Sequence, residues 1–131
     1  MHPTYFETLF DPHGFSGKWP AQFAIVTAWA TTGTCWSQAA NDEADRNLEL
    51  ELQRRGCWQH RITGYSPTTR HAEPGWAAEL PFEVACELGQ MFLQDALYFV
   101  DADHLYVTHC DGQRRRIYVG EFRRRLRSRL H

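Results

Sequence analysis

The chain has 131 residues, of which 43% are hydrophobic and 14% aromatic, and its formal net charge is −2. This length fits one domain, residues 1–131, and a chain near this size buries about two-thirds of its unfolded surface, so a core can form without disulfides or metals. No stretch has the roughly 18 consecutive apolar residues of a membrane span. The first residues lack the basic-then-apolar pattern of a signal peptide, so we expect a cytoplasmic protein that does not enter a membrane.

Residues 1–20 are expected to form an irregular N-terminal segment. Turn signals occur at 11–14 (DPHG) and at 16–18 (SGK), where Gly and Pro interrupt regular structure. Apolar side chains before these turns predict at most one helical turn that covers the core: Tyr5, Phe6, Leu9 and Phe10.

Residues 21–29 predict the first strand, because their four consecutive apolar residues are typical of a central strand that is covered on both faces. A loop of small residues follows at 30–40. The next segment, 41–55, is rich in the good helix formers Glu, Leu, Gln, Arg and Ala. We expect Asn41 to cap this helix and Gly56 to end it.

Residues 57–100 predict two strands, a second helix and a further strand. The strands are expected at 57–65 and 75–80, separated by a loop at 66–74 that is bounded by prolines. Pro81 suits the first position of a helix. A buried helical face is predicted by residues that recur at the i, i+3, i+4, i+7 spacing, namely Val84, Ala85, Leu88, Met91 and Phe92. The apolar run 96–100 favours a strand.

The segment 104–119 predicts a β-hairpin. Asp111-Gly112 is a strong signal for a two-residue turn between strands at 104–109 and 113–119. With that turn, His104 would pair with Val119 and Tyr106 with Ile117.

The predicted order is therefore β-α-β-β-α-β followed by a C-terminal β-hairpin extension. Two helices separated by strands of a mostly antiparallel sheet predict an α+β fold with two layers. The split βαβ, or ferredoxin-like, two-layer sandwich is the arrangement we expect.

Short motifs across residues 23–107 resemble a bacterial family catalogued as domain of unknown function 3293. The matching positions are FAIVTAW at 23–29, Asn41, Asn47, Gly64, Pro67, Glu73-Pro74, and Gln94 before the apolar run 96–99. The chain departs from the pattern twice, with Ala30-Thr31 in place of Asn-Pro and Phe92-Leu93-Gln94 in place of Phe-Gly-Gln. The resemblance implies an α+β domain and no particular chemistry.

Five polar residues at or near the ends of predicted elements form the first candidate ligand site: Thr27, Asn41, Asn47, Glu73 and Gln94. If these ends meet in space, the side chains converge on one pocket. The alternative is that all five satisfy backbone groups, as buried polar residues must.

His71 and Glu73, with His60 as a further histidine, are the candidates for catalysis. A carboxylate that orients an imidazole is the beginning of general acid–base chemistry. The sequence has no recognisable nucleophile motif and no glycine-rich phosphate loop. A His/Glu pair of this kind is more often structural, so the expectation leans away from an enzyme.

Neither a metal nor another cofactor is predicted. The residues of ligand type do not have the spacing of a zinc motif: Cys57, His60, His71, His104, His109 and Cys110. The four cysteines, which include no Cys-x-x-Cys pair, are expected to be free thiols.

The charge is unevenly distributed along the chain. Residues 114–131 contain eight Arg and one Glu, a net charge of +7, whereas residues 1–113 carry −9. The arginines that could bind a polyanion are Arg114, Arg115, Arg116, Arg123, Arg124 and Arg125. We favour the alternative, in which the arginines, including those of the basic tail at 121–131, neutralise the acidic body or a partner.

These patterns predict a small binding or interaction module, acting on a protein partner or as a homodimer. A small enzyme using Glu73 and His71 is one alternative. A nucleic-acid-binding domain with weak contacts through the basic tail is the other.

Overall fold

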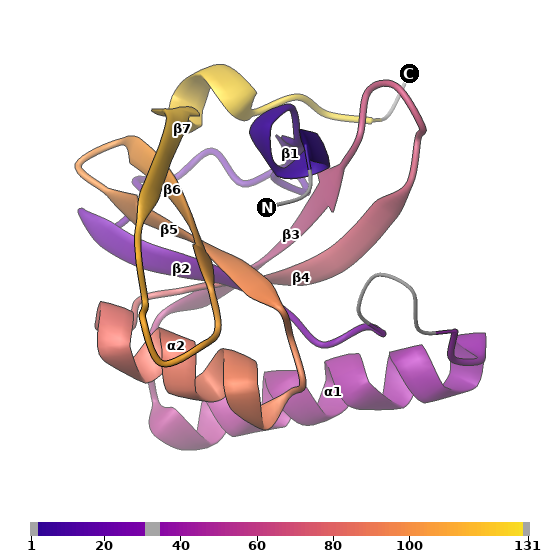
Figure 1. Ribbon diagram of the computed structural model, residues 1–131. Coiled ribbons are helices and arrows are strands. Elements are labelled where there is room, and N and C mark those ends of the chain that lie inside the picture. Colours follow the sequence, from indigo (N-terminus) through magenta and orange to yellow (C-terminus); the bar gives the residue numbers. More distant parts are fainter. Residues whose placement is uncertain (1–2, 31–34, 130–131) are drawn as a thin grey trace.

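A computed structural model describes residues 3–30 and 35–129 and shows an antiparallel sheet curled into a half-barrel (Figure 1). The strand order is β1-β3-β4-β2-β5-β6-β7. The part of the predicted 30–40 loop at residues 31–34 lies outside the described residues. The elements, in chain order, are η1 (Pro3–Phe6), β1 (Leu9–Asp11), β2 (Gln22–Thr27), α1 (Gln38–Arg55), β3 (Gln59–Tyr65), β4 (Ala72–Ala78), α2 (Phe82–Met91), β5 (Ala96–Asp101), β6 (His104–His109), β7 (Ile117–Glu121) and η2 (Phe122–Arg125).

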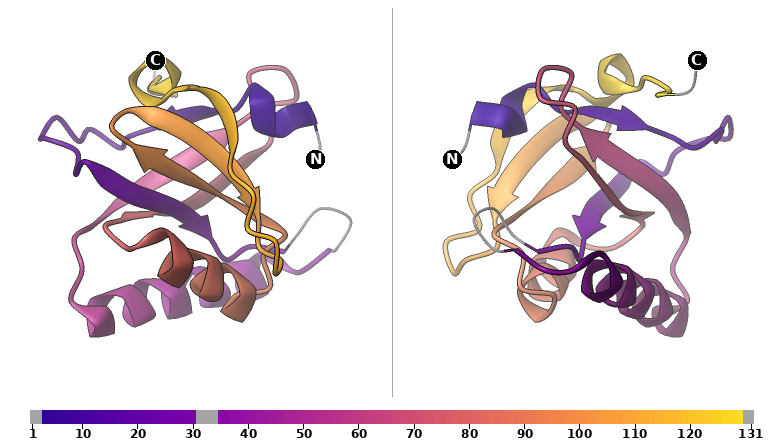
Figure 2. Two further views of the ribbon diagram at one scale, coloured as in Figure 1. Left: turned by 60° about the vertical axis from the view of Figure 1, so that its left-hand side comes forward. Right: turned by 90° about the vertical axis from the view of Figure 1, so that its right-hand side faces the viewer.

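Both α-helices lie on the outer face of the curled sheet, where α1 packs on β4 and α2 packs on β2 and β5 (Figure 2). The core between helices and sheet includes Leu48 and Leu52 from α1 and Leu88 from α2, all fully buried. No helix within the described residues is long and apolar enough to cross a membrane.

The N-terminus of α1 begins three residues before the predicted position. Ser37 caps the helix, because its side chain accepts a hydrogen bond from the Ala40 N–H. The prediction that Asn41 is the N-cap is therefore wrong. Gly56 ends the helix in the left-handed conformation, with φ of 69°, as predicted.

The buried face of α2 is confirmed for Leu88, which is fully buried. Val84 and Phe92 are half-buried against the same core. Met91 was expected on this face, but it is 57% exposed. Pro81 was expected at the first helical position. It is instead the N-cap, and the helix begins at Phe82.

A second core fills the inside of the half-barrel. Successive residues of β2 point to opposite faces, so that Phe23 and Ile25 join this inner core while Ala24 and Val26 join the outer one. The predicted double coverage of this strand is confirmed. Phe122 of η2 enters the inner core, with its ring centroid 5.1 Å from that of Phe23.

The predicted two-layer ferredoxin-like sandwich is wrong, because the chain forms one seven-stranded antiparallel sheet that curls into a half-barrel and has a core on each face. β1, within the segment expected to be irregular, pairs with β3, and β7 pairs with β6. After η2, Leu126 bridges to Phe10, and the Arg127 N–H donates to the Phe10 carbonyl at 2.9 Å. This segment runs across the inner side of the curled sheet (Figure 2).

The hairpin between β6 and β7 also differs from the prediction. His104 pairs with Glu121 and Tyr106 with Tyr118, and a bulge lies between Leu105 and Tyr106. The two strands are joined by a loop at 110–116 and not by a two-residue turn. Asp111 still organises the turn, since its carboxylate accepts hydrogen bonds from two backbone N–H groups of the loop.

Candidate functional site

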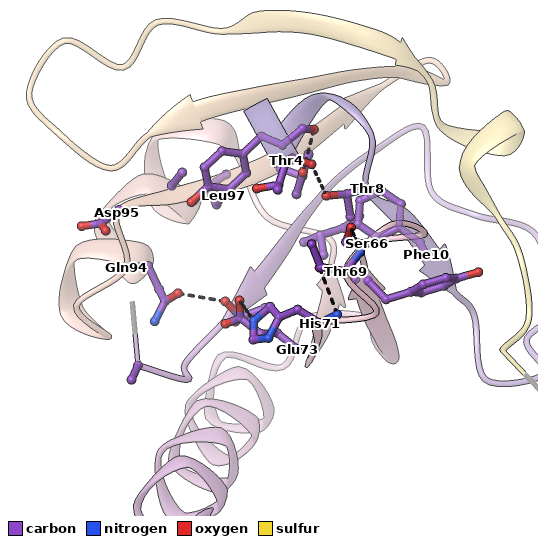
Figure 3. Close-up of a pocket in the computed structure, with 18 residues that line it drawn as sticks. Thr4, Thr8, Phe10, Ser66, Thr69, His71, Glu73, Gln94, Asp95 and Leu97 are labelled. Carbon is purple, nitrogen blue, oxygen red and sulfur yellow. Dashed lines mark hydrogen bonds and ion pairs between the residues drawn. The ribbon is translucent and has the colours of Figure 1, made fainter. Parts of the chain in front are cut away.

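A pocket of about 480 Å³ opens at one end of the half-barrel (Figure 3). Its walls come from η1 and β1, from the end of β2, from the turn between β3 and β4, and from the first residues of β4 and β5. Ile25 and Leu97 contribute aliphatic surface, and Tyr5, Phe10 and Tyr98 contribute aromatic surface.

The sheet topology brings the polar side chains of this pocket together. β2 runs antiparallel to both β4 and β5, so the end of β2 lies beside the beginnings of its two neighbours. Thr27 pairs with Gly75, two residues after Glu73. The strands approach closely here. A Cβ atom added to Gly75 would lie only 2.5 Å from the Val26 carbonyl oxygen, so a glycine at this position permits the close approach.

Gln94 ties the end of α2 to the end of β2. Its side-chain oxygen accepts a hydrogen bond from the Thr27 hydroxyl at 2.8 Å. Its side-chain nitrogen donates to the carbonyls of Trp29 at 2.8 Å and Phe92 at 3.1 Å. Gln94 is itself buried, so this network fixes one wall of the pocket.

Glu73 and His71 lie side by side at the pocket, with Nε2 of His71 3.3 Å from Oε2 of Glu73 (Figure 3). The Glu73 side chain is 33% exposed and that of His71 is 70% exposed. Burial raises the pKa of the Glu73 carboxyl, and His71 opposes that rise only in part. Glu73 therefore holds its proton to a higher pH than an exposed glutamate.

Tyr5 and Tyr98 contribute contacting aromatic rings to the pocket. The ring centroids of Tyr5 and Tyr98 are 6.1 Å apart, and the Tyr98 hydroxyl donates to the Tyr5 carbonyl at 2.8 Å. Burial raises the pKa of the Tyr5 phenol, and the charges of Glu73 and Asp95 raise it further. Burial also raises the pKa of Tyr98.

Three of the five predicted ligand-site residues line this pocket, namely Thr27, Glu73 and Gln94. Asn41 lies outside it and accepts a hydrogen bond from the Ala30 N–H at 3.0 Å, which attaches the segment after β2 to α1. Asn47 is exposed on α1 and does not line the pocket.

Sequence reasoning missed the pocket residues of the N-terminal segment and of β5. Tyr5 was expected only to cover the core, and Thr8 had no predicted role. The sequence did contain features that could have indicated two of these residues. Asp95 adjoins the candidate Gln94, and Tyr98 is a polar phenol within an otherwise apolar strand.

The second histidine considered for catalysis, His60, does not line this pocket, and its Nε2 is 3.0 Å from the Pro12 carbonyl oxygen. The cysteines that the structure describes are free. Within residues 3–30 and 35–129, no group of three His, Cys, Asp or Glu side chains could hold a metal ion.

Most of the candidate polyanion-binding arginines contact the protein itself. Arg114 forms an ion pair with Glu83. Arg116 lies over the Phe82 ring, with its guanidinium carbon 4.8 Å from the ring centroid. Arg115 is exposed.

The arginines of η2 also have partners within the chain, and those of Arg123 and Arg125 lie outside the tail. Arg123 lies 3.9 Å from Asp103, and Arg124 lies 3.3 Å from Glu121. Arg125 donates to the Thr8 carbonyl at 3.1 Å. Three of the six candidate arginines, Arg114, Arg123 and Arg124, thus lie beside carboxylates of the same chain.

A family model described as "Protein of unknown function (DUF3293)" matches residues 26–97. The match spans more than half of the chain, which therefore belongs to this family, and the resemblance inferred from the sequence motifs is confirmed. No curated protein and no solved structure matches the chain.

Proposed function

We propose that this member of the DUF3293 family is a binding module that holds a small organic ligand in the pocket at the open end of the half-barrel. The observation that carries the proposal is the cavity of about 480 Å³, within the range typical of small-molecule sites. It combines aromatic and aliphatic walls with convergent polar groups, the combination by which proteins fix the orientation of a small ligand.

The hydroxyl groups around the pocket support binding over catalysis. Ser66 accepts hydrogen bonds from the backbone N–H groups of Thr68 at 3.2 Å and Thr69 at 3.1 Å, so its side chain holds the turn between β3 and β4. The Thr27 hydroxyl donates to Gln94. Within the part of the chain that the structure describes, neither hydroxyl is hydrogen-bonded to a general base that would activate it as a nucleophile.

Ligand-observed NMR screening of a fragment library tests this function, with a variant that fills the pocket. Ala96 lines the pocket at the beginning of β5 and is only half-buried. Ala96→Trp should therefore occupy the cavity. The matched control is Ala39→Trp, on an exposed position of α1. Amide spectra establish that both variants remain folded.

Fragments should bind to the wild type and to Ala39→Trp, and their signals should be lost with Ala96→Trp. If no fragment binds the wild type, or if binding is unchanged by Ala96→Trp, the pocket is not a ligand site and the proposal is wrong.

A further inference from the structure

The amide of Gln94 offers no hydrogen-bond donor to the pocket. Its two N–H hydrogens are matched by two acceptors, the carbonyls of Trp29 and Phe92. Thr27 has given its only hydroxyl hydrogen to the Gln94 side-chain oxygen. These two side chains can therefore accept hydrogen bonds from a ligand through their oxygen lone pairs, but they have no hydrogen left to donate.

Two further hydroxyls that line the pocket have also donated their hydrogens to backbone carbonyls. The Thr8 hydroxyl donates to the Thr4 carbonyl at 2.9 Å, and the Tyr98 hydroxyl donates to the Tyr5 carbonyl at 2.8 Å. A hydroxyl has one hydrogen and two lone pairs, so each of these oxygens is left as an acceptor. A ligand that brings its own N–H donors can pair with these acceptor oxygens of Thr8, Thr27 and Tyr98.

The charges around the cavity favour the same kind of ligand. Glu73 and Asp95 both line it, and the charge of each raises the pKa of the Tyr5 phenol. Among the described residues that line the cavity, none is Lys or Arg, and His71 is the one side chain that can become a cation. A buried anion would face these carboxylates without a cationic partner, which is costly in a partly desolvated site.

The aromatic wall adds a further favourable contact for a positive charge. The rings of Tyr5 and Tyr98 line the cavity, and the faces of such rings attract organic cations that lie within about 6 Å of the ring centroid. Ile25 and Leu97 supply surface for an alkyl chain.

We infer that the ligand of this pocket is a small organic cation, a protonated amine or guanidine with an apolar chain, whose charged head is bound by Glu73. The inference rests on the proposed binding function and deepens it. The acceptor oxygens receive the N–H groups, the carboxylates balance the charge, and the aliphatic residues contact the chain.

Three probes of the same size separate charge from shape: butylamine, 1-butanol and butyrate. NMR titration at mildly alkaline pH measures their affinities for the wild type, for Glu73→Gln and for Glu79→Gln. Glu79 is an exposed carboxylate that does not line the pocket, so its variant is the matched control. We expect butylamine to bind the wild type at least about tenfold more tightly than 1-butanol, and butyrate to bind more weakly than both. Glu73→Gln should abolish this preference, and Glu79→Gln should retain it.

The failure of this inference can be told apart from the failure of the proposed function. If 1-butanol or butyrate binds as tightly as butylamine, or if only neutral or anionic fragments bind, the pocket binds ligands but does not select cations. If Glu73→Gln retains the preference, Glu73 does not bind the charged head. If neither the three probes nor any fragment binds, both proposals fail.

Discussion

Glu73 is the residue on which the proposed selectivity depends. Burial raises the pKa of its carboxyl, so the folded protein binds this proton more tightly than the unfolded chain does. The contribution of Glu73 to stability is therefore greatest at low pH. It decreases as the pH rises through the ordinary glutamate range towards the raised value in the folded protein.

Replacing Glu73 by Gln should raise the melting temperature at neutral pH, because a neutral amide avoids the desolvation cost of the buried charge. This increase in melting temperature should become smaller as the pH falls below the ordinary pKa range of a glutamate, because the wild-type carboxyl is then also neutral. Melting curves of the wild type and of Glu73→Gln across this pH range measure the effect, with Glu79→Gln as control. A lower melting temperature for Glu73→Gln at neutral pH would show that its charge stabilises the fold.

Gly75 controls the spacing of β2 and β4 at the edge of the pocket. Gly75→Ala places a methyl group 2.5 Å from the Val26 carbonyl oxygen, where backbone has to move. We expect a loss of about 1–3 kcal/mol in the free energy of unfolding, as is typical of overpacking. Chemical denaturation measures it, with Gly112→Ala as control because the space around Gly112 is open. Equal stability of the two variants would contradict this account of the strand contact.

The candidate site could be predicted in part at the residue scale. Thr27, Glu73 and Gln94 were identified because they are polar residues at or near the ends of predicted elements. Asn47 was expected to line the pocket, but it lies on an exposed face of α1 and does not line it. Tyr5 could not be placed in advance, because its position depends on how the N-terminal segment returns across the sheet.

At the scale of elements, α2 is the helix that closes the outer core behind β2 and β5. Leu88 is its most deeply buried large side chain. Leu88→Ala should cost about 2–5 kcal/mol of stability through lost transfer energy and the cavity that remains. Urea denaturation measures the change, and Glu87→Ala on the exposed face of the same helix is the control. A cost below about 1 kcal/mol would be inconsistent with the burial of this face.

The longer elements were predictable from periodicity and composition, and the short ones were not. Residues 22–27 form a strand and 82–91 a helix close to the predicted bounds. β1 has only three residues, and it is a strand because β3 pairs with it. The β6–β7 register was mispredicted because Asp111-Gly112 suggests a tight turn, whereas the loop extends to residue 116 and the bulge shifts the pairing.

At the scale of the whole molecule, the C-terminal segment belongs to the inner core. The tail at 121–131 was expected to be a basic end because its arginines dominate its composition. Phe122 is nevertheless fully buried, and its ring packs against those of Phe10, Trp19 and Phe23. Composition could not reveal this, since a single aromatic residue anchors the segment.

Phe122→Ala should therefore cost about 3–5 kcal/mol in the free energy of unfolding, as is typical of a buried phenylalanine. The control is Phe6→Ala, because the Phe6 side chain is 42% exposed. Guanidinium denaturation followed by tryptophan fluorescence measures both. Similar small effects for the two variants would mean that η2 does not contribute to the core.

The central claim is that the open end of the half-barrel binds a small organic cation at Glu73. Its most direct test is to titrate butylamine into isotope-labelled protein at mildly alkaline pH and to map the NMR shift changes. Saturable changes should centre on Thr27, Glu73 and Leu97, and they should weaken as the pH falls and Glu73 becomes protonated. Changes that centre on the arginines of η2 or on β7, or an affinity that does not depend on pH, would contradict the account.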